Sequence, residues 1–149
     1  MNPTRDGRGF TLIELILVLL LTAALAVTAL PKIVDLGLWR LRAFGDDMQA
    51  QHQAMLRLAL QQRRPIVATI TGANVTYTDG ATVLQTINCP ATESPCIAEG
   101  GSRTVTFNVG NSGSTSTSSG AAMTVTVASG GYSQAYQIEH ETGLIYALP

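Results

Sequence analysis

The sequence predicts an α+β fold, in which a long N-terminal helix packs on an antiparallel β-sheet. Three observations favour this class: an apolar run with one charge over residues 10–30, apolar residues at helical spacing over residues 31–64, and short β-rich segments over residues 65–149. The length of 149 residues suits one globular head with a small core plus an anchor. We therefore expect these three parts after a short polar leader at residues 1–9.

The first expected element is a transmembrane helix over residues 10–30. Its only charged residue is Glu14. At about 1.5 Å per residue, such a helix is roughly 30 Å long, which matches the hydrocarbon core of a bilayer. A carboxylate there costs on the order of 2.5–3.5 kcal/mol at the bilayer centre and less near an end, so Glu14 is a candidate functional residue.

An ordinary secretory signal peptide is the alternative interpretation of the same run. It would be cut after small residues, for which Ala24 and Ala26 are candidates. Two features oppose it, because the run is longer than a typical signal core and a signal peptide gains nothing from a charge near its start. Arg5 and Arg8 favour a cytoplasmic leader, but cations also follow the run, so charge alone does not decide its orientation.

The junction between the leader and the run carries a more specific signal. The segment Arg8-Gly9-Phe10-Thr11-Leu12-Ile13-Glu14-Leu15 resembles the prepilin leader junction of type IV pilins and type II secretion pseudopilins. The resemblance implies that a prepilin peptidase cuts between Gly9 and Phe10 and that Phe10 is then N-methylated. It also implies that Glu14 meets the N-terminal amine of a neighbouring subunit, and that Pro31 bends the helix. Pairing with an amine would compensate a buried carboxylate.

The resemblance also implies a location and a set of partners. The chain would begin as a single-pass inner-membrane protein, with its N-terminus in the cytoplasm and its head in the periplasm, and would then enter a filament. Its partners would be other pilin subunits, bound through the N-terminal helix, together with the prepilin peptidase and the inner-membrane assembly platform.

Within this family, the main interpretation is a structural subunit of a type IV pilus. Residues 26–32 resemble the corresponding stretch of mannose-sensitive haemagglutinin (MSHA) pilins, which favours a minor or MSHA-like pilin. One alternative is a pseudopilin of a type II secretion system, which shares the same motif. Another is a surface- or DNA-binding minor pilin, although Arg103 is the only lysine or arginine beyond Pro65, which disfavours nucleic acid.

Residues 31–64 are expected to form an amphipathic stem helix. Gly37 and Gly45 weaken it, and the residue before Pro65 avoids helical geometry, so the helix should end there. The opposite, polar side should carry Arg42, Asp46, Gln49 and Gln53. The expected buried face consists of Ile33, Leu41, Phe44, Met48, Met55, Leu58 and Ala59.

The head should be built from strands. A hairpin turn at residues 139–143 and a mobile surface loop at residues 111–120 are expected between them. The predicted strands are residues 66–70, 74–78, 82–87, 103–109, 122–127, 136–138 and 144–148.

The two cysteines, Cys89 and Cys96, predict one disulfide if the head is extracytoplasmic. Closing so short a loop stabilises the fold by about 2.5 kcal/mol in the chain-entropy model. The alternative is a pair of free, buried thiols. Neither a C-x-x-C pair nor a nearby histidine accompanies them, so a zinc or redox site is not expected.

The sequence contains no recognisable catalytic motif, so we expect a non-enzymatic protein without a cofactor or metal. The cluster Glu139-His140-Glu141 contains possible metal ligands, but adjacent turn residues rarely converge on one ion, and we expect them to be solvated. A net charge of −1 gives no global basic field for binding nucleic acid or acidic lipid.

Overall fold

In a computed structural model, the chain divides into two compact units between Asp35 and Leu36, and each unit is described by itself. The structure describes the backbone of residues 10–33 and 36–149, and the side chains of residues 10–26 and 36–149. The predicted leader, including Arg5, Arg8 and Gly9, lies outside the described residues.

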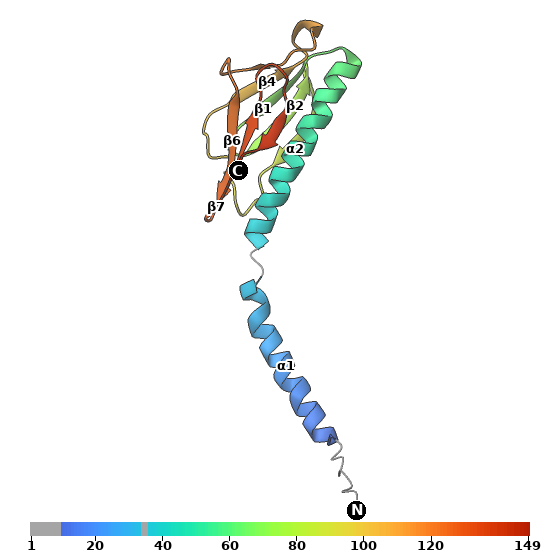
Figure 1. Ribbon diagram of the computed structural model, residues 1–149, viewed down its shortest axis with the longest axis vertical. Coiled ribbons are helices and arrows are strands. Elements are labelled where there is room, and N and C mark those ends of the chain that lie inside the picture. Colours follow the sequence, from blue (N-terminus) through green and yellow to red (C-terminus); the bar gives the residue numbers. More distant parts are fainter. Residues whose placement is uncertain (1–9, 34–35) are drawn as a thin grey trace, which may run out of the picture. The chain divides into compact units, whose positions relative to one another are not determined.

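The first unit contains helix α1 (Leu12–Ile33), which is drawn in blue in Figure 1. Leucine and alanine, both strong helix formers, dominate its sequence. The helix continues past the expected end at Leu30, and Pro31 lies in its last turn. Within the part of the chain that the structure describes, neither helix combines the length and the apolar character of a membrane span.

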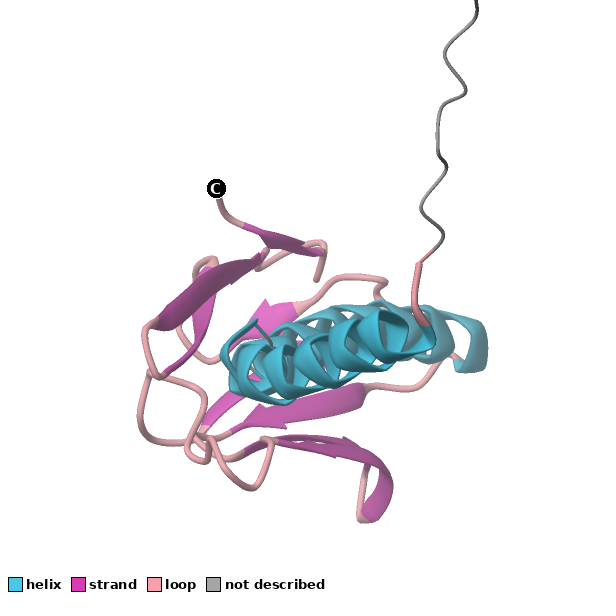
Figure 2. Ribbon diagram, turned by 90° about the horizontal axis from the view of Figure 1, so that it is seen from below, coloured by secondary structure: helices cyan, strands magenta, loops and turns pink. Residues whose placement is uncertain are grey.

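The second unit contains helix α2 (Leu36–Gln62) and two antiparallel sheets (Figure 2). One sheet has five strands in the order β3-β2-β1-β4-β5, and the other has three in the order β6-β7-β8. Helix α2 contacts strands of both sheets, which confirms the predicted α+β class with two sheets in place of one. The strands are β1 (Ile66–Ile70), β2 (Asn74–Asp79), β3 (Thr82–Asn88), β4 (Arg103–Phe107), β5 (Ser116–Thr117), β6 (Met123–Ser129), β7 (Tyr132–Ile138) and β8 (Ile145–Ala147).

The core lies between α2 and the inner faces of the sheets. Strand β1 pairs with both β2 and β4, and its alternation buries Ile66, Ala68 and Ile70 on one face. The neighbouring strands add Tyr77 and Phe107, which are both fully buried. The helix contributes Leu41, Phe44, Gly45, Met48, His52, Leu56 and Ala59 as its buried residues.

The buried face of α2 differs in part from the expected one. Leu56 is buried, whereas Met55 and Leu58 pack only partly against the core. Gly45 was expected to weaken the helix, but in the structure it has a role in packing. A Cβ at this position would overlap the Tyr136 hydroxyl. Glycine therefore permits α2 to approach β7 closely at this point.

Helix α2 ends at Gln62, close to the expected boundary at Pro65. Arg63 adopts a left-handed conformation (φ 54°), and the Arg64 N–H donates to the Ala59 carbonyl at 3.2 Å. This bond is the one that closes a Schellman motif at a helix C-terminus. The Asn108 side chain donates a second bond to the same carbonyl at 3.0 Å, so this helix end is tied to the segment after β4.

Two predictions for the head, the end of one strand and the nature of one loop, are wrong. Strand β4 ends at Phe107 because Asn108 turns left-handed (φ 54°), so Val109 does not continue the strand face. Residues 111–120 are not a mobile surface loop throughout, since they include strand β5 and the buried Thr115 and Thr117. The Thr117 hydroxyl donates to the Ala121 carbonyl at 2.6 Å, which lets this tract without apolar side chains contribute to a core edge.

Candidate functional site

The start of α1 is the candidate assembly site, and Thr11 caps it. The Thr11 carbonyl accepts hydrogen bonds from the Glu14 and Leu15 N–H groups at 3.1 and 3.2 Å. The Thr11 hydroxyl lies 3.4 Å from the Glu14 nitrogen, at the far limit of a capping contact. The Thr-x-x-Glu spacing of a capping box is present here, and the sequence reasoning overlooked it.

Glu14 therefore lies in the first turn of α1. A negative charge is favourable at this end of a helix, because the unpaired N–H groups carry partial positive charge. The carboxylate thus has a local structural role in addition to the one implied by the resemblance. In the uncut chain the nitrogen of Phe10 belongs to the peptide bond with Gly9, so a charged amine at Phe10 arises only if that bond is cut.

Large apolar side chains are exposed on all sides of α1. Phe10 is 79% exposed and Ile16, one of the less exposed, is still 47% exposed. A helix that is hydrophobic all round is normally buried in a larger protein assembly or in lipid. The exposed set is Phe10, Leu12, Ile13, Leu15, Ile16, Leu17, Val18, Leu19, Leu20, Leu21 and Leu25.

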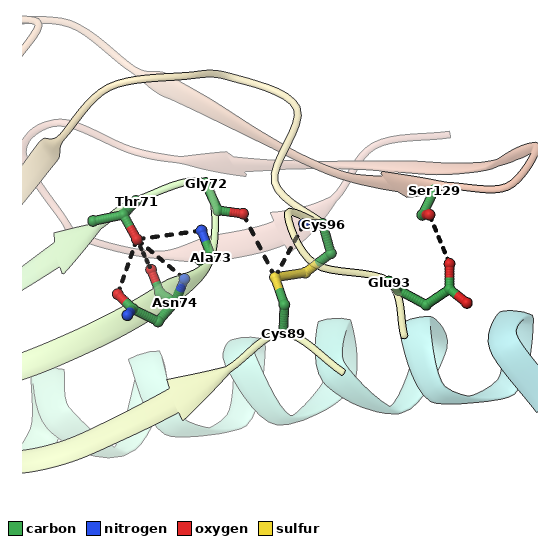
Figure 3. Close-up of a disulfide and its surroundings, with 8 residues drawn as sticks. All are labelled: Thr71, Gly72, Ala73, Asn74, Cys89, Glu93, Cys96 and Ser129. Atoms are coloured by element: carbon green, nitrogen blue, oxygen red, sulfur yellow. Dashed lines mark hydrogen bonds between the residues drawn. A yellow bond between two sulfur atoms is a disulfide. The ribbon is translucent and has the colours of Figure 1, made fainter. Parts of the chain in front are cut away.

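The head contains the predicted disulfide between Cys89 and Cys96, with Cα atoms 5.7 Å apart (Figure 3). The Cys96 N–H donates to the Gly72 carbonyl at 3.0 Å, and the Cys89 N–H donates to the Ala73 carbonyl at 2.8 Å. The bridge therefore holds the loop against the turn between β1 and β2. Within the loop, the Glu93 carboxylate accepts a bond from the Ser129 hydroxyl at 2.6 Å.

The chain after the bridge joins the second sheet. The Ala98 N–H donates to the Thr126 carbonyl at 2.9 Å, and the Ala128 N–H donates to the Cys96 carbonyl at 2.8 Å. Ile97 is paired with Val127 by the same contacts. The disulfide loop consequently connects the five-stranded sheet to β6, and its role in the structure is to hold the two sheets together.

The Glu139-His140-Glu141 cluster does not converge on one point. The Glu139 carboxylate accepts a bond from the Tyr146 hydroxyl at 2.6 Å, while His140 Nδ1 accepts one from the Thr117 N–H at 3.1 Å. His140 is half-buried, so the expectation of a solvated turn residue is wrong for it. No group of three potential metal ligands occurs among the described residues.

His52 lies on α2 and is a core residue. It is 1% exposed, and its ring meets the Phe107 ring edge-on with centroids 4.7 Å apart. Burial disfavours the charged imidazolium and lowers the pKa of His52 to about 4, although a hydrogen bond to the Gly143 backbone acts in the opposite direction. The imidazole is therefore neutral at physiological pH and belongs to the packing.

Comparison with known protein families gives one match, which lies at the N-terminus of the chain. The family described as "Prokaryotic N-terminal methylation motif" matches residues 4–30, which include the start of α1 and Glu14. No curated protein and no solved structure matches the chain. The matched motif is that of structural filament subunits, and it supports a protein of the type IV pilin and pseudopilin family.

Proposed function

We propose that this chain is a structural subunit of a type IV pilus, a minor or MSHA-like pilin that assembles through α1. The observation that carries the proposal is the methylation motif at residues 4–30, with Glu14 in the first turn of a helix whose large apolar side chains are exposed. The resemblance of residues 26–32 to MSHA pilins supports the finer assignment.

In this proposal, prepilin peptidase removes residues 1–9 and methylates Phe10. Cleavage leaves a cationic amine at Phe10, four residues before Glu14. A helix rises about 6 Å over four residues, and the terminus can be presented to an adjoining subunit more easily than it can bend back on Glu14. Pairing between chains then sets the axial register, which apolar helix packing alone would fix poorly.

Before assembly, residues 10–30 would anchor the subunit in the inner membrane, with residues 65–149 in the periplasm. The sequence supports this anchor through the length and apolarity of that run. The disulfide between Cys89 and Cys96 supports the periplasmic head, because such bonds persist in oxidising compartments. The assembly platform in the same membrane would then transfer the subunit into the filament.

The experiment that tests the pilus assignment is deletion of the gene, followed by complementation with a tagged copy. We expect the tagged protein in sheared surface filaments, and loss or altered function of those filaments in the deletion strain. The pseudopilin alternative has the same motif and predicts the opposite pattern, in which filaments persist and secretion of exported enzymes into the medium stops. Normal filaments together with lost secretion would overturn the pilus assignment.

A further inference from the structure

The first turns of α2 present two large apolar side chains to solvent. Leu36 is 59% exposed and Trp39, the only tryptophan of the chain, is 62% exposed. They are three residues apart and therefore share one side of the helix. With 3.6 residues per turn, this side is opposite the one that buries Leu41 and Met48 in the core.

Charge on this side changes sign along the helix. Arg40 is exposed next to Trp39. Farther along, the same side continues with the exposed Ala43 and then with the acids Asp46 and Asp47. Apolar and cationic groups thus occupy the first two turns, and acidic groups follow. A contact with another helix needs an apolar stripe along the helix axis. Here apolar and cationic residues come first along the axis and acidic residues follow, which suits a helix that passes from an apolar layer into water.

The number of connecting residues limits how far Trp39 can lie from the end of the apolar run. Trp39 follows Leu30 by nine residues, most of them helical. Counting about 1.5 Å per helical residue and at most about 3.6 Å for each other step, Trp39 is within roughly 20 Å of Leu30. If residues 10–30 cross the bilayer, Trp39 cannot be far from the headgroup layer.

We propose that Leu36 and Trp39 dock into the headgroup layer of the membrane that holds residues 10–30, with Arg40 facing lipid phosphates. The inference rests on the membrane anchor of the proposed function. Tryptophan favours this layer because its ring is apolar and its N–H is polar, and the guanidinium of arginine matches phosphate geometry. Asp46 and Asp47 mark where the helix leaves the anionic surface. The docking sets the height of the unassembled head above the membrane.

Trp39 is itself the probe for the test. The full chain is reconstituted into phospholipid vesicles that contain a fraction of anionic lipid, and flotation with the vesicles is measured first. Tryptophan emission is then recorded with lipids brominated near the headgroup and, separately, with a water-soluble quencher. The matched control carries Leu60→Trp in a Trp39→Phe background, because Leu60 is 44% exposed in the last turn of the same helix.

We expect brominated lipid to quench Trp39 strongly and the control tryptophan hardly at all, with the water-soluble quencher showing the reverse order. Arg40→Glu should reduce the quenching of Trp39 by brominated anionic vesicles. If the chain floats but Trp39 behaves as the control does, the docking is overturned while the anchor stands. A chain that does not float overturns the anchor and the docking together. Protection of Trp39 only in assembled filaments would identify a neighbouring subunit as its partner and also overturn the proposal.

Discussion

Glu14 has a local place in the first turn of α1 and, in our proposal, a separate role in assembly. Its backbone N–H is bonded to the capping residue Thr11, and its charge suits the helix N-terminus. The proposed intersubunit pairing with the Phe10 amine needs the charge alone. Glutamine can replace glutamate at the third position of a capping box, so one substitution removes the charge and keeps the local structure.

We therefore predict that Glu14→Gln leaves processing and the amount of membrane protein unchanged but impairs incorporation into filaments. Crosslinking of the variant to its neighbouring subunits measures the effect directly. The matched control is Thr11→Ala, which keeps the carboxylate and removes the cap at a cost of about 0.5–2 kcal/mol of helix stability. Crosslinking of Glu14→Gln at the level of the unsubstituted chain would show that Glu14 does not set the register.

His52 gives the head a pH dependence of stability. Its pKa is about 4 in the folded state and 6.5 in the unfolded chain, so the unfolded state binds the proton first as pH falls. The stabilisation is complete above pH 6.5 and is lost between there and about pH 4. With about 1.36 kcal/mol per pKa unit, the loss is on the order of 3 kcal/mol.

We predict that His52→Gln flattens this part of the profile, because glutamine does not titrate and retains a donor for the Gly143 backbone. Urea unfolding of both proteins at a series of pH values between 7 and 4 measures the difference. Equal slopes for the two proteins over this range would mean that His52 does not couple protonation to unfolding.

At the scale of elements, the approach of α2 to β7 depends on Gly45. Alanine at an exposed helix position is usually more stable than glycine by about 1 kcal/mol. At this position the added Cβ overlaps the Tyr136 hydroxyl, so Gly45→Ala should destabilise the head by about 1–3 kcal/mol. Thermal unfolding of the two proteins provides the comparison.

The hydroxyl of Tyr136 supplies the control for this prediction. Tyr136→Phe removes the atom that the new Cβ meets most closely, so Gly45→Ala should cost less in that background. Equal costs in both backgrounds would point to a cause other than this contact, such as a shift of the whole helix.

The disulfide connects elements of both sheets through hydrogen bonds around Cys96. Replacing Cys89 and Cys96 by serine should lower the free energy of unfolding by about 2.5 kcal/mol, since the unfolded chain gains loop freedom. Hydrogen exchange should accelerate at the Ala98 and Ala128 N–H groups more than in the middle of α2.

Thiol labelling of the denatured, unreduced natural chain should find no free cysteine, and two labelled cysteines would contradict the bridge.

Local patterns predicted the elements well where one periodicity dominated. Strand β1 was expected at residues 66–70 and lies there, because a short run rich in β-branched residues precedes a turn. The end of β4 was missed, since the left-handed turn at Asn108 depends on its contacts with the end of α2. The burial of Thr117 and the partial burial of His140 were also missed, because their hydrogen bond joins residues far apart in the sequence.

At the scale of the whole molecule, the chain combines a unit built for contact with its surroundings and a unit that buries its own core. The apolar side chains of α1 are exposed, whereas those of the head pack between α2 and two sheets. From the change in composition after residue 30, the sequence predicted a separate apolar segment at residues 10–30, a stem at residues 31–64 and a head at residues 65–149. It could not predict two sheets, because pairing between strands depends on long-range contacts that a local pattern does not contain.

The intact mass of the mature protein tests the central claim most directly. Processing of the leader is what would release α1 for assembly and create the amine that Glu14 would meet. We predict that the protein purified from its source begins at Phe10 and carries one additional methyl group, and that a bulky residue in place of Gly9 leaves uncut precursor. A mature chain that begins after Ala24 or Ala26 would contradict the account, because α1 would then have been removed as part of an ordinary signal peptide.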